Sequence, residues 1–193
     1  MITIKKHVWL TSLLLGMVAA LILATPAQAG KSKRVIELEN QAKASLAKLY
    51  AGHAKARDLR TRAKAVLTFP SVMKIGFAGG IQVGTGVLTD MKGRTLGYYN
   101  STAGSFGYQA GIKGFNYSLF LMNDKAIGRL TSAGGLQLGM GPSLVIVKAG
   151  KTMGFTTTTL DKDIYAFIYD VKGVFGGAGI EGTKFTKISA PAD

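Results

Sequence analysis

The sequence of 193 residues contains no cysteine, only four prolines and two histidines, and 10 acidic residues against 24 Lys and Arg. The absence of cysteine excludes a disulfide framework, a zinc ribbon, a thiol nucleophile and a lipid-modified cysteine. With 47% hydrophobic and 18% charged residues, the chain is too apolar for a disordered protein, and its length suits one domain. The formal net charge of +14 predicts an anionic partner, which composition leaves open as lipid, nucleic acid or an acidic protein.

The one long hydrophobic run of the sequence lies near its N-terminus. Two lysines precede an apolar stretch at 8–24, and Pro26 leads into the sequence Ala-Gln-Ala-Gly at 27–30. This order of basic, apolar and small residues is typical of a secretory signal peptide, here 1–29, that is cleaved after Ala29. An uncleaved membrane anchor is the alternative, although the apolar stretch has only the minimum length for spanning a bilayer.

Cleavage would leave a single domain at 30–193 with a net charge of +12, because two lysines leave with the signal peptide. The predicted location is the periplasm or the exterior of a bacterial cell. That location argues against nucleic acid as the partner and favours anionic phospholipid or a membrane surface. Because Gly30 stands where a lipoprotein needs its acylated cysteine, we do not expect a lipoprotein.

Residues 31–67 are predicted to form a basic helical front. Apolar residues recur there every three or four positions, which indicates one apolar stripe along an α-helix. Gly52 and His53 interrupt the stripe, so we expect two helices, the second ending before Phe69-Pro70. The segment holds ten basic and three acidic residues and therefore carries +7 of the charge.

The basic helical front has two interpretations. A basic amphipathic helix can lie on an anionic membrane, but a helix that packs on the core through its stripe and exposes its charges to water is the commoner case. The stripe consists of Ala, Leu and Val without large aromatics, which favours packing onto a sheet. Lys31, Lys33 and Arg34 precede the stripe, and we therefore expect these three to contact lipid headgroups.

Residues 72–188 are predicted to be β-rich. Glycine is frequent there and apolar residues alternate over short runs, which predicts strands at 75–89, 94–102, 105–113, 116–122, 136–148, 153–160, 164–171 and 173–187. Asn123 or Asp124 can cap a short helix through Leu130. The expected fold class is α+β, with basic N-terminal helices packed on a glycine-rich, mostly antiparallel β-sheet or barrel-like sandwich.

A Gly-x-Gln-x-Gly repeat starts at Gly80, Gly107 and Gly135. Alternation along a strand places its glycines and glutamine on one face and its two remaining residues on the other. The nearly bare face predicts close packing of another backbone, with ligand access as the alternative.

No motif of the sequence predicts catalysis or a metal site. Residues 177–182 spell G-x-G-x-x-G, but 183–187 alternate as a strand, so no helix follows to bind a pyrophosphate. His53 lacks local partners for a metal site or a triad. Asp161 and Asp163 flank a lysine and have no third acid nearby. We therefore expect no enzyme, no cofactor and no bound metal.

Four motifs of the sequence occur together in one known family. They are Ala63-Lys64-Ala65-Val66 before Phe69-Pro70, Gly107-Tyr108-Gln109-Ala110-Gly111, Leu121-Met122-Asn123, and Tyr169 with Lys172-Gly173-Val174-Phe175-Gly176-Gly177-Ala178-Gly179-Ile180-Glu181-Gly182. Through these motifs the chain resembles the SYLF-domain family over about 35–188. The resemblance implies an α+β fold and, from the family's membrane-binding members, affinity for anionic phospholipid through the N-terminal segment. It extends the expected contacts to Lys43 and Lys48, which occupy the matching segment.

Three functions are open at this point. The first is a non-enzymatic lipid-binding protein of the bacterial cell envelope that contacts anionic phospholipid through Lys31, Lys33, Arg34, Lys43 and Lys48. The second is a scaffold or protein-interaction module with an acidic protein partner. The third is a small outer-membrane β-barrel, against which the helical front and the polar C-terminal tail argue.

Overall fold

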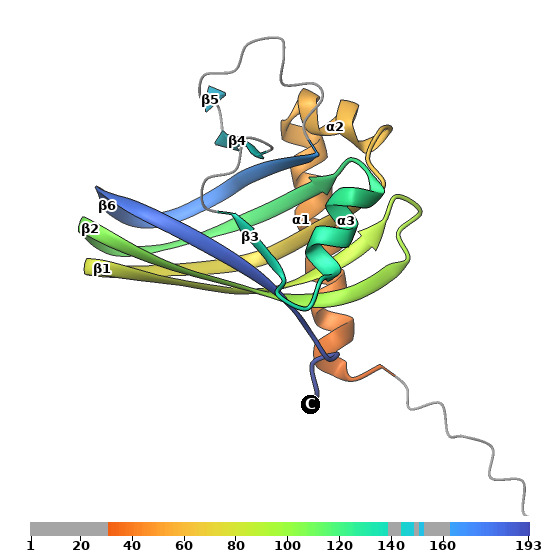
Figure 1. The fold of residues 1–193 in the computed structure, drawn as a ribbon, viewed down its shortest axis with the longest axis horizontal. Helices are drawn as coiled ribbons and strands as arrows, with labels where there is room; N and C mark the ends of the chain where they lie inside the picture. Colours follow the sequence, from red (N-terminus) through yellow and green to blue (C-terminus); the bar gives the residue numbers. More distant parts are fainter. Residues whose placement is uncertain (1–30, 139–143, 149–150, 153–162) are drawn as a thin grey trace, which may run out of the picture. The chain divides into compact units, whose positions relative to one another are not determined.

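The computed structural model describes residues 31–138, 144–148, 151–152 and 163–193. Ser32–Asp193 form one compact unit, and the predicted signal peptide lies outside the described residues. The helices are α1 (Lys33–Gly52), α2 (Ala54–Arg60) and α3 (Asp124–Thr131). The strands are β1 (Ala65–Asp90), β2 (Thr95–Leu121), β3 (Leu136–Leu138), β4 (Leu144–Lys148), β5 (Lys151–Thr152) and β6 (Ile164–Ile188) (Figure 1).

Three very long strands make up most of the sheet. β2 lies in the middle and pairs antiparallel with β1 on one side and with β6 on the other. Two short strands share the outer edge of β6, β3 antiparallel and β4 parallel to it, and β5 pairs with β4. In the described part of the chain the sheet is open and mostly antiparallel. This arrangement, with helices against it, confirms the predicted α+β class.

The sheet folds over, because each long strand bends and returns (Figure 1). Aromatic rings from the two halves of the strands meet inside the fold: Phe185 lies 5.4 Å from Phe69 and 5.8 Å from Tyr117 between ring centroids. The two halves of β1 also approach closely, since a Cβ atom added at Gly86 would lie 2.7 Å from the carbonyl oxygen of Thr68. The interior of this fold is the larger hydrophobic core.

The helices α1 and α2 cover the face of the first half of β1 that points away from the interior of the folded sheet. Leu49 of α1 and Leu59 of α2 are fully buried there, against Val66, Phe120 and Phe167. The apolar stripe predicted from the sequence is therefore the surface that packs on the sheet. Because this stretch of β1 is covered on both faces, all five residues from Ala65 to Phe69 are buried.

The predicted end of the helical front at residue 67 is wrong. α2 ends at Arg60, and Ala65 already pairs with Leu121 in the sheet. A strand that is buried on both faces is apolar at consecutive positions. The apolar residues at 65–67 also fit the spacing of the preceding helix, so the sequence pattern extended the helix too far. Pro70 does not end a helix; it lies within β1 at an irregularity between Phe69 and Val72, where a residue without an N–H is tolerated.

The predicted strand at 153–160 lies outside the described residues. The division of the rest of this region into short strands is also wrong, because glycines continue the long strands β1, β2 and β6 instead of ending them. β1 passes through register shifts between Phe77 and Gly79 and between Leu88 and Thr89, with Ala78 at a positive φ of 59°. These irregularities bend β1 without interrupting its pairing. The short helix is confirmed: the Asn123 side chain accepts a hydrogen bond from the first turn of α3.

The repeated glycine motif adopts different orientations in its copies. In the first copy Gln82 is buried and faces the interior of the fold, and a Cβ at Gly84 would lie 2.9 Å from Val72. That contact supports the close-packing interpretation for this copy. In the third copy the flanking leucines, Leu136 and Leu138, are buried and the glutamine is exposed. The side chains at 107–109 in the second copy lie outside the described part.

Candidate functional site

Lys33 and Arg34 occupy the exposed first turn of α1. Ser32 caps this helix by accepting a hydrogen bond from the backbone N–H of Val35. The Ser32 hydroxyl also donates to the carbonyl oxygen of Pro191 at 2.7 Å, so the first turn is attached to the C-terminal residues. Lys31 is exposed and lies outside the compact unit Ser32–Asp193.

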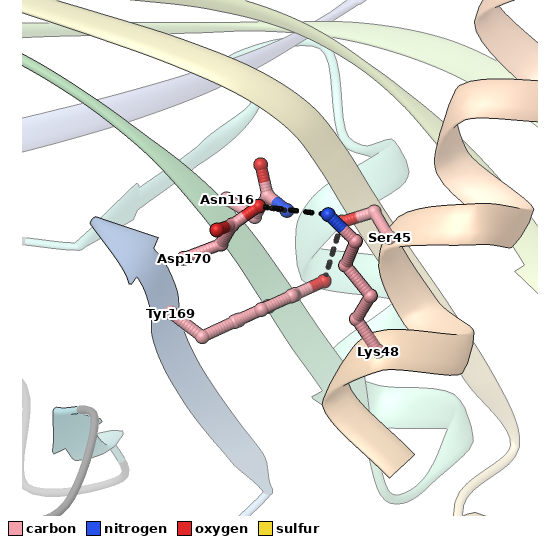
Figure 2. A network of polar contacts seen from close by, with 5 residues as sticks. All are labelled: Ser45, Lys48, Asn116, Tyr169 and Asp170. Atoms are coloured by element: carbon pink, nitrogen blue, oxygen red, sulfur yellow. Dashed lines mark hydrogen bonds and ion pairs between the residues drawn. The ribbon is translucent and has the colours of Figure 1, made fainter. Parts of the chain in front are cut away.

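Lys43 and Lys48 do not form one patch on α1. Five residues of an α-helix correspond to about 140° of rotation, so the two side chains leave opposite flanks. Lys48 forms an ion pair with Asp170 of β6, with 3.2 Å between Nζ and Oδ2 (Figure 2). The structure therefore gives Lys48 a partner within the protein, and the two lysines do not act together as one site.

The Lys48 ion pair is part of a polar network that fastens α1 to the sheet (Figure 2). Asn116 of β2 donates to the same Asp170 carboxylate at 3.5 Å. Asp170 has a positive φ of 51° and lies where β6 carries one more residue than β2, so a bulge turns its side chain toward the helix. Aspartate tolerates this backbone conformation better than most residues.

Tyr169 is the buried part of this network. Its hydroxyl lies 2.8 Å from the Ser45 hydroxyl of α1 and 3.0 Å from the Ser118 hydroxyl of β2. Burial raises the pKa of Tyr169, although the two serine hydrogen bonds act in the opposite direction. The tyrosine is thus a neutral link between helix and sheet. Sequence reasoning noted Tyr169 within a family motif but assigned no contact to it.

Lys43 lines a pocket of about 200 Å³ beside α1. This basic pocket has three cationic side chains from separate segments: Lys43 of α1, Arg60 of α2 and Lys92 of the turn between β1 and β2. Its apolar lining includes Ala42, Leu46, Val66, Val87 and Met91. The pocket therefore combines positive charge with an apolar wall.

The acidic residues of the basic pocket are occupied by other protein groups. Glu39 accepts hydrogen bonds of 2.8 Å from the hydroxyls of Thr95 and Tyr98. Asp90 accepts a 2.6 Å hydrogen bond from the Arg94 side chain, and hydrogen bonds from Arg94 hold the pKa of Asp90 below its usual value. By contrast, Lys43 has no ion-pair partner in the described part of the chain.

Arg60 and Tyr50 form the wall of the basic pocket nearest to α2. The Arg60 guanidinium lies over the Tyr50 ring, 5.1 Å from its centroid. Burial raises the pKa of Tyr50 to about 12, so the phenol is neutral, while the positive charge of Arg60 partly opposes this shift. A cation held over a ring keeps its outer N–H groups available to an anion.

Sequence reasoning missed Arg60 and Lys92 as members of a site. Both lie in segments remote from Lys43 along the chain, and no local motif joins them. One signal was present: Lys43, Leu46 and Tyr50 are spaced by three and four residues, which places them on one flank of a helix. That spacing identifies the flank but not the segments facing it.

Among the described residues, no group of three histidine, cysteine, aspartate or glutamate side chains could hold a metal ion. None of the helices in the described ranges is long and apolar enough to cross a membrane.

The fold defines an α+β domain in which a helix is fastened across a folded antiparallel sheet, beside a basic pocket. Residues 102–190 match the model of the Ysc84 family, described as Las17-binding protein actin regulator. This match confirms the SYLF resemblance over these residues. The family is linked to lipid binding and to actin-related scaffolds. No curated protein matches the chain significantly.

Proposed function

We propose that this protein is a non-enzymatic lipid-binding protein of the bacterial cell envelope that contacts anionic phospholipid through its basic N-terminal helical segment. The observation that carries the proposal is the basic pocket, which Lys43, Arg60 and Lys92 line together with apolar side chains. A phosphate headgroup would bind the cations, and the adjoining apolar part of the lipid would contact the lining. Lys33 and Arg34 would add outlying contacts from the exposed first turn of α1.

The charge of the basic pocket suits an anion bound at a membrane surface. Each lysine or arginine near an anionic membrane contributes about 1 kcal/mol at physiological salt. The two carboxylates of the pocket, Glu39 and Asp90, already accept hydrogen bonds from other protein groups. They therefore compete little with a bound anion for the cations of the pocket. Exposed contacts are screened by ions, so binding should weaken as the salt concentration rises.

Sedimentation with vesicles of phosphatidylglycerol and phosphatidylcholine tests this function. The double variant Lys43→Glu/Lys92→Glu should lower binding at least tenfold, because each reversal replaces attraction with repulsion. Lys125→Glu/Lys187→Glu makes the same change in net charge on exposed residues outside the pocket and should lower binding much less. Equal losses in the two variants would show that binding depends only on net charge, which would contradict a binding site in the pocket.

Two further measurements distinguish a membrane lipid from a free phosphate and from a protein partner. Glycerol phosphate in solution offers the headgroup chemistry without a membrane, and calorimetry should detect much weaker binding than to vesicles. Pull-down from periplasmic extract tests the scaffold alternative: capture of an acidic protein by wild type but not by Lys43→Glu/Lys92→Glu, with no vesicle binding, would favour it.

The proposed location is the periplasm or the cell exterior, reached through a signal peptide at 1–29. The arrangement of basic, apolar and small residues before Gly30 supports it. The intact mass of protein from the envelope fraction should correspond to a chain that starts at Gly30. A mass that includes the first 29 residues would contradict cleavage and favour the anchor.

A further inference from the structure

Seven large apolar side chains are exposed around the bend of the sheet, at the end remote from α1 (Figure 1). Phe77 and Phe106 are the extreme cases, with 88% and 82% of their surface exposed. We call this surface the apolar cap; its residues are Met73, Ile75, Phe77, Ile81, Val83, Phe106 and Ile112. Six of them line a groove of about 700 Å³, so the cap is hollowed as well as apolar.

The pairing register shows that a lysine bounds the apolar cap on each side of the bend. Met73, Gly114 and Lys172 form one row across β1, β2 and β6, and residues paired in this way share a face. Val83, Thr102 and Lys184 form the corresponding row beyond the bend. Both lysines are exposed and neither has an ion-pair partner in the described ranges.

The polarity of the two faces is reversed around the bend. The inner face buries Lys74 and Gln82, which are only 5% and 4% exposed, while Ile75 and Ile81 face outward. Paired residues share a face, and Ser105 and Ser101, which pair with Gly80 and Gly84, are buried on the same inner face as Gln82. An ordinary water-soluble sheet places its apolar face inward, so an outward apolar face of this size indicates a partner.

An irregularity in β1 produces this reversal. Before it, Leu67 and Phe69 point into the fold, and unbroken alternation would continue inward with Met73, Ile75 and Phe77. The shift between Phe69 and Val72 inserts one residue, so Val72 is buried in the core and the apolar set faces outward. The exposure of the apolar cap is therefore built into the strand pairing.

We propose that the apolar cap inserts into the hydrocarbon of an anionic bilayer, with Lys172 and Lys184 at the level of the headgroups. An apolar surface with a lysine on each side, Lys172 and Lys184, matches the apolar interior and anionic border of such a membrane leaflet. A second copy of the chain is disfavoured as the occupant, since stacking two caps would bring the lysines of both copies together. The choice of a bilayer rests on the proposed lipid-binding function, but the residues are different.

A single tryptophan placed in the cap tests the insertion directly. The chain's one tryptophan, Trp9, lies in the proposed signal peptide, so in the cleaved protein Phe106→Trp carries a single reporter in the cap. On phosphatidylglycerol vesicles its emission should shift to shorter wavelength, and lipids brominated on their acyl chains should quench it. The matched control Ala133→Trp carries its reporter at an exposed position outside the cap and the basic pocket, and should show neither effect.

The variant Phe77→Ser/Phe106→Ser tests whether the apolar cap contributes to binding. It should lower partitioning at least tenfold, because each exposed phenyl group leaves water on insertion, and the loss should persist at high salt. Since both side chains are almost fully exposed, the melting temperature should stay near that of wild type.

The remaining outcomes separate this inference from the proposed function. Retained binding by Phe77→Ser/Phe106→Ser, with loss by Lys43→Glu/Lys92→Glu, would overturn the inserted cap and leave the lipid-binding function standing. The opposite pattern would support the cap and contradict the basic pocket. A cap tryptophan that stays unquenched on bound vesicles, or that changes only as the protein dimerises without lipid, would overturn the insertion.

Discussion

Replacing Gly86 by alanine tests the close crossing of the two halves of β1. The added Cβ would lie 2.7 Å from the Thr68 carbonyl oxygen and 2.6 Å from a ring carbon of Phe69. The ring can move slightly, but the carbonyl belongs to a paired strand and cannot. Overpacking of this kind costs about 1–3 kcal/mol. For a domain of this size each kcal/mol lowers the melting temperature by about 2–4 °C, so we expect a fall of about 2–12 °C.

Gly104→Ala is the matched control for this experiment. Gly104 also lies within a long strand, but an added Cβ would have no heavy atom within 4 Å. Alanine there reduces the conformational freedom of the unfolded chain and should leave stability unchanged or raise it by about 0.4–1 kcal/mol. Calorimetric melting of both variants decides the matter. A Gly86→Ala protein that melts with the wild type would refute the crossing and, with it, the folded-over sheet.

Two further predictions concern the tyrosines. Tyr169→Phe should lower the free energy of unfolding by about 1–3 kcal/mol in a urea titration, because the buried Ser45 and Ser118 hydroxyls lose a partner. Adding Ser45→Ala should cost less in that background than in wild type; additive losses would contradict the contact. Burial raises the pKa of Tyr50 and of Tyr98 to about 12, from 10.0 in the unfolded chain. The folded state therefore favours the protonated phenols, and the stability they contribute below pH 10 should be lost as the pH rises through 12. Tyr50→Phe should reduce this alkaline loss in pH-dependent melting, and an unchanged profile would show that Tyr50 does not contribute.

Local sequence signals predicted those parts of the fold that depend on one element at a time. The spacing of apolar residues located α1, and the Asn123 cap located α3, because both patterns lie within a single helix. The predicted end of the helical segment was wrong near Ala65, because burial of a strand on both faces depends on what packs against the sheet. Helical spacing and a doubly buried strand then give the same local pattern.

Alternation of apolar residues alone could not predict which face of each long strand points into the core. Alternation groups Met73, Ile75 and Phe77 on one face but does not say whether that face points inward. The answer depends on one additional residue in β1 near Pro70, and such an irregularity shows only in the pairing with β2. The glycine repeat has the same ambiguity, since its first and third copies bury opposite faces.

Net charge indicated an anionic partner but could not assign a role to each basic residue. Lys48 binds Asp170, and Arg57 donates to the carbonyl oxygens of Tyr50 and Ala51 at the end of α1, so part of the basic charge holds the helices in place. Lys43, on the other flank of the same helix, lines the basic pocket. A helix fastened along one flank presents the other at a fixed position relative to the sheet, and preorganised cations bind an anion with less loss of conformational freedom. The network of Tyr169, Ser45 and Lys48 therefore supports the proposed lipid contact without touching lipid.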